Sequence, residues 1–419
     1  MIRGEKKRIF ALYYSMMMKK FAILLFCCLS ILFATANDGV FYAEGNQLIP
    51  ITETDISVRK EVLTINRVGK HLEVTVYYEF FNPVGEKELL VGFEAQSPYN
   101  SMADALKMLP KHPHIRNFKV VVNGDPIIYE IAHVDRGCCY MDDTYTFSQY
   151  YVNGKFTDWT AQRIRDTLAV CPHPPGMPID YVYHFKAKFR HGLNIIQHTY
   201  DYDLSFSQEY EFYFFYVLTA ANRWANHQID DFTLNINMGD RESFIIRPDF
   251  FKTADEWVFT GRGKTSVDSI WVWDEDLNRM ICPNFHIQEG GISFYKTNFH
   301  PEGELRIYKR NYWSYFWNYK EEDYGKLSNG LMTALSKEGY FVRRLSDFSQ
   351  ISVEDTMQYT RFQRRILKNL PFAYRGYIFR RKKSQDYFES TEWYLPNPKY
   401  KADMETLSLE EKKWVEFWK

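Results

Sequence analysis

The chain reads Leu72-Glu73-Val74-Thr75-Val76-Tyr77-Tyr78-Glu79-Phe80, in which apolar residues alternate with mostly polar ones. A period of two residues is typical of a β-strand with one buried face. The turn-forming run Asn82-Pro83-Val84-Gly85 follows it and predicts the end of the strand. The stretch therefore predicts a sheet that covers a core on one side.

A second signal lies at Asn123-Gly124-Asp125-Pro126, because Asn and Gly tolerate the positive φ that tight hairpin turns require. Its arms are expected at 118–122 and 127–129. Many short strands separated by turns predict a mainly β fold, an antiparallel β-sandwich over residues 37–310, rather than alternating strands and helices. Further strands are expected at 181–189, 209–218, 232–238 and 304–308.

Two helical insertions are expected within the sandwich. One spans 101–109 and is stopped by Pro110; the other is capped by Asp158 and runs to about Val170. An aromatic and charged connection, 311–345, then leads to a small α-helical C-terminal domain at 346–419. There Phe362, Ile366 and Leu370 share one helical face, and 408–411 form a capping box for a last helix.

The N-terminus has the pattern of an export signal. Lys19 and Lys20 precede an apolar run, 21–33, and the small-residue site Ala34-Thr35-Ala36 follows. The run is shorter than the roughly 20 residues of a membrane-spanning helix, so cleavage before Asn37 is favoured over a transmembrane anchor in the mature chain. We therefore expect residues 1–36 to be a signal peptide and the mature protein to be exported, periplasmic or extracellular.

Composition restricts the partners. The formal net charge of −1 gives no overall surplus of positive charge for binding nucleic acid or anionic membranes in general. Four cysteines remain after the leader, in a compartment that permits disulfides. The expected bridge joins Cys138 or Cys139 to Cys171, although four cysteines allow three pairings.

No metal or cofactor is expected. His112, His114, Cys171 and His173 are soft ligands, but no spacing requires them to meet. A cysteine and a histidine from this set would also suit nucleophilic catalysis, with a disulfide competing for the thiol.

Two local motifs are incomplete. Gly263-Lys264-Thr265 resembles the end of a phosphate-binding loop, but the glycine needed five positions earlier is Val258. Asp274, Asp276 and Asn278 have the spacing of calcium ligands, but Arg279 replaces the turn glycine. We interpret the second as a solvated acidic turn.

The aromatic runs 210–216 and 312–319 would either present flat faces to sugars or peptides, or fill cores. Core packing is the favoured interpretation.

Residues 367–379, which include Phe372-Ala373-Tyr374-Arg375-Gly376, resemble the signature of the YARHG domain. The runs 385–388, 393–396 and the helix after Leu407 follow in that family's order. Phe372, Tyr374 and Arg375 stand where the family has Tyr, Arg and His, so no role of that His transfers. The resemblance implies an extracellular bacterial domain without an assigned activity. We identify a candidate interaction or packing centre: Phe372, Arg375, Gly376, Tyr377, Trp393 and Tyr394.

The start of the mature chain, Asn37-Asp38-Gly39, is similar to that of a family of uncharacterised exported bacterial proteins. Neither resemblance carries catalytic residues. The sequence therefore favours a non-catalytic binding or structural protein of the cell envelope, with an envelope glycan or protein as partner. The alternatives are an envelope glycan or peptidoglycan hydrolase whose carboxylates meet only in the fold, and a module that captures glycans through exposed aromatics.

Overall fold

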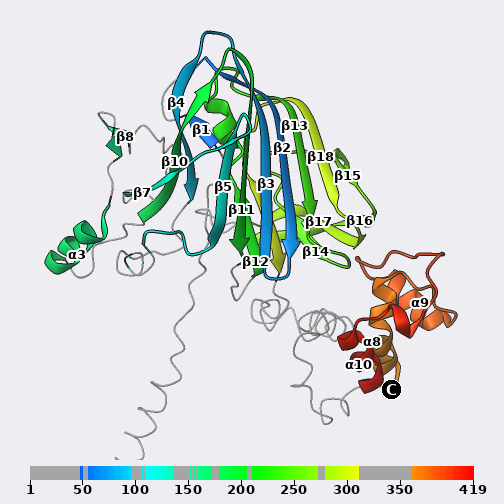
Figure 1. Ribbon diagram of the computed structural model, residues 1–419. Helices are drawn as coiled ribbons and strands as arrows, with labels where there is room; N and C mark the ends of the chain where they lie inside the picture. Colours follow the sequence, from blue (N-terminus) through cyan, green and yellow to red (C-terminus); the bar gives the residue numbers. More distant parts are fainter. Residues whose placement is uncertain are drawn as a thin grey trace, which may run out of the picture. The chain divides into compact units, whose positions relative to one another are not determined.

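The computed structural model describes residues 48–50, 55–95, 106, 109–135, 151–152, 155–156, 159–171, 179–204, 210–271, 279–310 and 361–419. Most of these residues form β-strands, and the helical part is small and lies mainly at the C-terminus (Figure 1). The mainly β prediction is therefore confirmed.

The largest sheet has eight strands, and its order along the sheet is not the order in the chain. All of its pairs are antiparallel except β13 with β2, which run parallel. In spatial order the strands are β15 (Trp257–Phe259), β18 (Ile292–Phe299), β13 (Ile229–Asn237), β2 (Ser57–Val68), β3 (His71–Asn82), β11 (Gly192–Asp203), β5 (Ile115–Val122) and β6 (Asp125–Pro126).

Two smaller antiparallel sheets accompany it. The first contains β1 (Leu48–Pro50), β4 (Lys87–Ala95), β10 (Ile179–Phe189) and β7 (Glu130–Asp135). The second contains β12 (Tyr210–Tyr216), β19 (Leu305–Arg310), β14 (Ser243–Ile246), β17 (Arg279–Glu289) and β16 (Arg262–Trp271). A short pair, β8 (Tyr151–Val152) and β9 (Lys155–Phe156), stands apart.

One continuous apolar core draws on the eight-stranded sheet and both smaller sheets. In β3 the predicted alternation is observed, since Val74, Val76, Tyr78 and Phe80 are at most 1% exposed while the residues between them are partly exposed. The alternation thus fixes which face of β3 enters the core, because a shift by one residue would expose all four side chains.

The hairpin prediction is right at the turn and wrong in its second arm. Asn123 and Gly124 adopt φ of 53° and 93°. The returning strand is only β6, Asp125–Pro126. The Ile127 N–H still donates to the Val120 carbonyl at 2.9 Å, but 127–129 lie outside any strand before β7 joins another sheet. The predicted strands at 181–189, 209–218, 232–238 and 304–308 correspond to β10, β12, β13 and β19.

Helix α3, Ala161–Val170, is capped by Thr160 rather than by Asp158. The Thr160 hydroxyl accepts a hydrogen bond from the Arg163 N–H at 3.2 Å, and the Arg163 guanidinium lies 4.1 Å over the Trp159 ring. A threonine closer to the helix therefore takes the capping role. The expected insertion at 101–109 lies almost entirely outside the described residues.

The C-terminal part consists of α8 (Arg361–Tyr374), α9 (Lys382–Glu389) and α10 (Leu409–Phe417). Ile366 and Leu370 are buried and Phe362 packs beside them, which confirms the predicted helical face. The predicted capping box is also present, with Ser408 and Glu411 bonded reciprocally. Within the described ranges, no helix is both long enough and apolar enough to cross a membrane.

Candidate functional site

Gly376 occupies a position that accepts only glycine. Its φ is +80°, and a Cβ there would lie 2.4 Å from the Leu395 carbonyl oxygen and 2.7 Å from the Asn397 nitrogen. The Gly376 carbonyl also accepts a hydrogen bond from the Asn397 N–H at 2.7 Å. The turn after α8 is therefore in direct backbone contact with the loop 391–397.

Arg375 connects the end of α8 to the start of α10. Its guanidinium donates to both carboxylate oxygens of Glu411, at 2.8 and 2.7 Å, and to the carbonyls of Pro371 and Thr406. Burial alone would raise the pKa of Glu411, but the hydrogen bonds from Arg375 and Ser408 hold that pKa below its ordinary value. A bidentate pair of this kind fixes geometry as well as charge.

Of the remaining candidates, Trp393 and Tyr394 pack against Phe388 of α9. Tyr374 stacks on Trp393 with ring centroids 4.2 Å apart. The Tyr394 hydroxyl donates to the Tyr377 carbonyl at 2.9 Å. Phe372 packs in a separate small cluster with Leu407 and Val415. The structure thus places all six candidates within one helical unit.

Residues 344–419 match the sequence profile of the YARHG domain. The C-terminal part of this chain is a YARHG domain. Arg375 and Gly376 occupy the last two positions of the five-residue motif. In this chain Arg375 binds Glu411, and Gly376 allows close backbone contact with the loop 391–397. The similarity of residues 37–39 to exported bacterial proteins stays a prediction.

Solved structures resemble the chain only distantly. A proposed nutrient binding protein from Legionella pneumophila is 15% identical, over 90% of this chain and 98% of that chain, with a TM-score of 0.43. An M1 zinc metallopeptidase from Deinococcus radiodurans is 9% identical, over 61% and 42%, with a TM-score of 0.23. Baculovirus P35 is 9% identical, over 62% and 98%, with a TM-score of 0.24. These likenesses carry no argument about function. Among curated proteins, no sequence matches the chain.

The YARHG domain is hydrogen-bonded to strands β16 and β17. Arg262 of β16 donates to the Pro396 carbonyl at 2.9 Å and to the Gln288 side-chain oxygen at 2.9 Å. Gln288 of β17 donates in turn to the Leu395 carbonyl at 2.9 Å. Backbone carbonyls of the loop 391–397 therefore receive side-chain donors from the sheet.

A chain of polar groups continues from this junction into the sheet. The buried ring of His286 lies between two hydroxyls, with Ser243 Oγ 2.8 Å from Nδ1 and Ser266 Oγ 2.8 Å from Nε2. The Ser266 hydroxyl donates to Glu392 of the YARHG domain at 3.2 Å. Burial, with a smaller contribution from the nearby Lys264 ammonium, lowers the pKa of His286 to about 3.

The hydrogen bonds around His286 determine which atoms of this polar network carry the protons. Ser266 has one proton, which it donates to Glu392, so its oxygen accepts the proton on Nε2 of His286. Nδ1 then accepts from Ser243. The arrangement differs from a serine hydrolase triad, in which a carboxylate orients the second nitrogen of the histidine.

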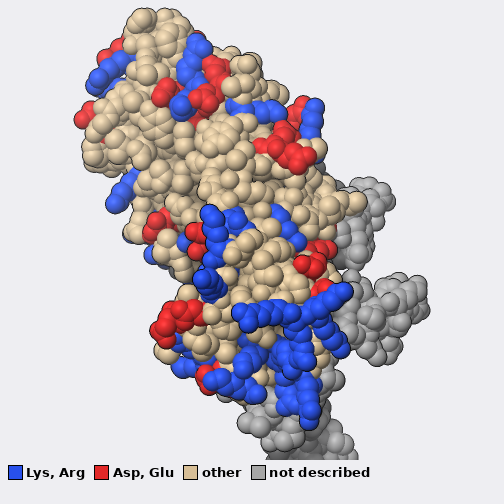
Figure 2. All heavy atoms as spheres, turned by 90° about the vertical axis from the view of Figure 1, so that its right-hand side faces the viewer, with Lys and Arg blue, Asp and Glu red and all other residues tan. Residues whose placement is uncertain are grey.

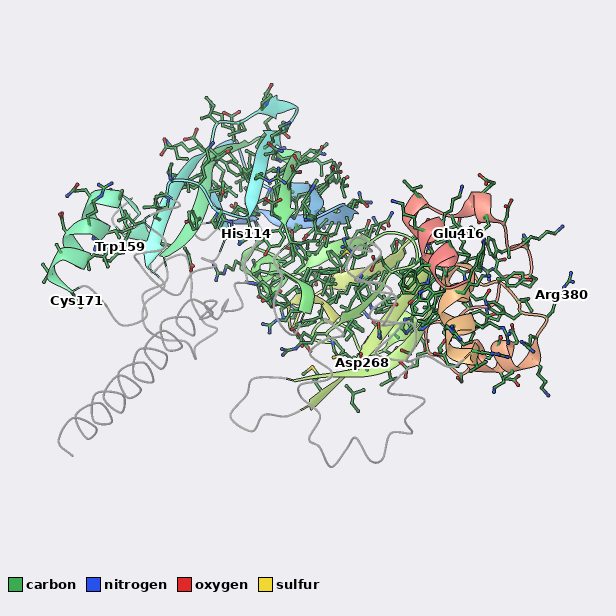
Figure 3. The ribbon with its side chains drawn as sticks, turned by 90° about the horizontal axis from the view of Figure 1, so that it is seen from below. His114, Trp159, Cys171, Asp268, Arg380 and Glu416 are labelled. Atoms are coloured by element: carbon green, nitrogen blue, oxygen red, sulfur yellow. The ribbon has the colours of Figure 1, made fainter. Side chains whose placement is uncertain are left out.

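Of the metal and thiol candidates, the structure describes His112, His114 and Cys171, and the rings of His112 and His114 have centroids 6.0 Å apart. His112 Nδ1 accepts hydrogen bonds from the N–H groups of His114 and Ile115, at 3.1 and 3.2 Å, so this nitrogen stabilises a turn. Cys171 is exposed at the end of α3 (Figure 3). His173, Cys138 and Cys139 lie outside the described residues, and the disulfide stays a prediction. No group of three or more potential metal ligands occurs in the part of the chain that the structure describes.

The aromatic run in β12 is buried. Phe212, Tyr213, Phe214, Phe215 and Tyr216 are each at most 4% exposed. Among the Phe, Trp and Tyr side chains whose burial the structure describes, Tyr295 is the one that is exposed. Gly263, Lys264 and Thr265 lie in strand β16, which excludes a phosphate-binding loop there. The second aromatic run and the acidic turn at 274–278 lie outside the described residues.

Proposed function

We propose that the protein is an exported, non-catalytic binding or structural protein of the bacterial cell envelope. The leader pattern of residues 1–36 supports export, and the YARHG domain supports the same compartment. We further propose residues 37–310 as a β-sandwich scaffold, 311–345 as a connection and 346–419 as the YARHG unit.

The observation that carries the non-catalytic proposal is the state of His286. Both of its ring nitrogens are engaged by serine hydroxyls, and its pKa of about 3 leaves it a weak base at neutral pH. A general base works best when its pKa lies near the operating pH. The polar chain through Ser243, Ser266 and Glu392 is better suited to hold the two parts of the chain together.

We propose a packing role for the six candidate residues of the YARHG domain. The Arg375 side chain is only 12% exposed, and its two terminal nitrogens donate to Glu411, Pro371 and Thr406. Tyr394 is buried, and Tyr374 covers one face of Trp393. A small helical unit needs such large side chains to build a core of its own.

The test combines binding and catalysis in one incubation. The purified chain is mixed with peptidoglycan and other envelope glycans, and pull-down and product release are followed together. The proposal expects retention on an envelope component and no released fragments. Released fragments would contradict the non-catalytic proposal, and their loss in the Ser266→Ala variant would assign the hydrolysis to the Ser266–His286 pair.

The export proposal has its own measurement. Mass spectrometry of the native protein should find Asn37 at the N-terminus, in material from outside the cytoplasm. Protein that retains residues 21–36 and is recovered from the cell interior would contradict export.

A further inference from the structure

The YARHG domain carries a concentration of positive charge that the whole-chain balance conceals. Residues 361–383 contain nine Lys and Arg and no Asp or Glu, whereas the complete chain has a net charge of −1. Figure 2 shows Lys and Arg side chains gathered over the lower part of the surface in that view. Seven of the nine are exposed, and we call these the basic face: Arg361, Arg364, Arg365, Arg380, Arg381, Lys382 and Lys383.

Two helices contribute to this face and are in contact. Arg361, Arg364 and Arg365 have the i, i+3, i+4 spacing that places side chains on one side of α8. The Lys383 ammonium of α9 lies 4.5 Å over the ring of Phe362 in α8, which brings the two sets of cations together. In the described part of the chain, none of the seven forms an ion pair, so their charge is available to a partner.

The start of α9 is electrostatically unfavourable without a partner. Arg381 stands at the N-cap without a side-chain cap hydrogen bond, and Lys382 and Lys383 fill the first turn, which has no acidic residue. The N-terminal end of a helix carries partial positive charge, so acidic residues are usual there and cations are destabilising. An anion placed against this turn would be attracted by the side chains and by the helix end together.

The same segment exposes an apolar side chain. Ile378, 43% exposed, lies in the connection between α8 and α9, two residues before Arg380, which points away from the domain (Figure 3). An apolar residue among Lys and Arg is typical of surfaces that bind the headgroup region of a bilayer, where the apolar group enters and the cations meet phosphates. A soluble polyanion has no apolar layer that the Ile378 side chain could enter.

We propose that the basic face, with Ile378, binds the surface of a membrane that contains anionic phospholipids. The partner is recognised by its phosphate groups and by the apolar layer beneath them. The proposal rests on the binding role proposed above and names the partner. Vesicle binding tests it directly, and that result is independent of the glycan incubation.

The test is co-sedimentation of the full chain with vesicles of phosphatidylcholine, with and without phosphatidylglycerol. Binding is expected only with phosphatidylglycerol, and it should weaken as salt is added. Each Lys or Arg near an anionic surface strengthens binding about fivefold, so the variant Arg380→Gln/Arg381→Gln/Lys382→Gln/Lys383→Gln should bind at least about 100-fold more weakly. The matched control neutralises four other exposed lysines of the domain: Lys399→Gln, Lys401→Gln, Lys413→Gln and Lys419→Gln.

Two further variants keep the test decisive. Replacing Lys383 also removes its contact with Phe362. A second variant, Arg361→Gln/Arg364→Gln/Arg365→Gln, removes charge, leaves that contact in place and should also lose vesicle binding. Ile378→Ser should weaken binding to vesicles but not to duplex DNA. Equal losses in the control and the basic-face variants would overturn the membrane proposal. So would vesicle binding that is unchanged in Ile378→Ser and no tighter than binding to duplex DNA.

Discussion

His198 should make the β-rich part sensitive to acid. Its ring is fully buried in β11, among the rings of Tyr78, Phe93, Phe118 and Tyr200. Neither ring nitrogen has a hydrogen-bond partner among the described residues. Burial lowers the pKa of His198 to about 3, and no neighbouring charge contributes to that shift.

The magnitude follows from the two pKa values. In the unfolded chain a histidine titrates near about 6.5, so below that pH the unfolded chain binds a proton that the folded chain excludes. The free energy of unfolding is therefore largest above about pH 6.5 and falls as the pH decreases. At about pH 5 the loss from this one residue is about 2 kcal/mol, and it stays near that value if the folded pKa is anywhere below about 4.

The assay compares urea unfolding of the wild type and of His198→Phe between about pH 7.5 and pH 5. Phenylalanine fits an aromatic environment and cannot be protonated, so the variant should lose about 2 kcal/mol less on acidification than the wild type. Tyr200→Phe is the matched control, because burial raises the pKa of Tyr200 well above its ordinary value and it stays neutral throughout. Equal acid sensitivity of wild type and His198→Phe would refute the reasoning, since the ring would then be accessible to protons in the folded state.

Two further substitutions test the YARHG domain by chemical denaturation. Gly376→Ala should cost at least about 2 kcal/mol of unfolding free energy, because a positive φ and a backbone carbonyl both oppose the new Cβ. Gly124→Ala, also at positive φ but with open space around it, should cost only about 1 kcal/mol; equal costs would contradict the steric argument. Arg375→Met should destabilise the domain by about 3 to 5 kcal/mol, because Glu411 keeps its charge without its guanidinium partner. Arg116→Met, in an exposed pair, should cost less than about 1 kcal/mol, and a similar loss for Arg375→Met would show that its pair is effectively solvated.

The parts of the fold that could be predicted are those set by local chemistry. Alternation in β3, positive φ at Asn123 and Gly124, and the capping box at Ser408 each depend on a few adjacent residues. Strand order is different in kind. Nothing local indicates that β13 pairs in parallel with β2, because that pairing depends on the burial of both strands in one sheet.

The junction could not be predicted for the same reason. Ser243, Ser266 and His286 come from three strands, and Glu392 follows them by more than a hundred positions. Each residue is ordinary in its own segment, and only the sheet register brings His286 opposite Ser243. The loop carbonyls at 395–396 give no sequence signal at all, since every residue has one.

Net charge of the whole chain is a coarse guide where local charge matters. A net charge of −1 means that the chain as a whole has no surplus of positive charge. Electrostatic attraction in physiological salt falls off over about 8 Å, so a partner interacts with the charges of one face and not with those of the whole chain. The run 361–383 could have been read as such a face, because it contains no acidic residue. What the sequence could not supply is that Lys383 of α9 folds back onto Phe362 of α8. That contact turns two basic segments into one surface, and it is why charge is better counted per folded face than per chain.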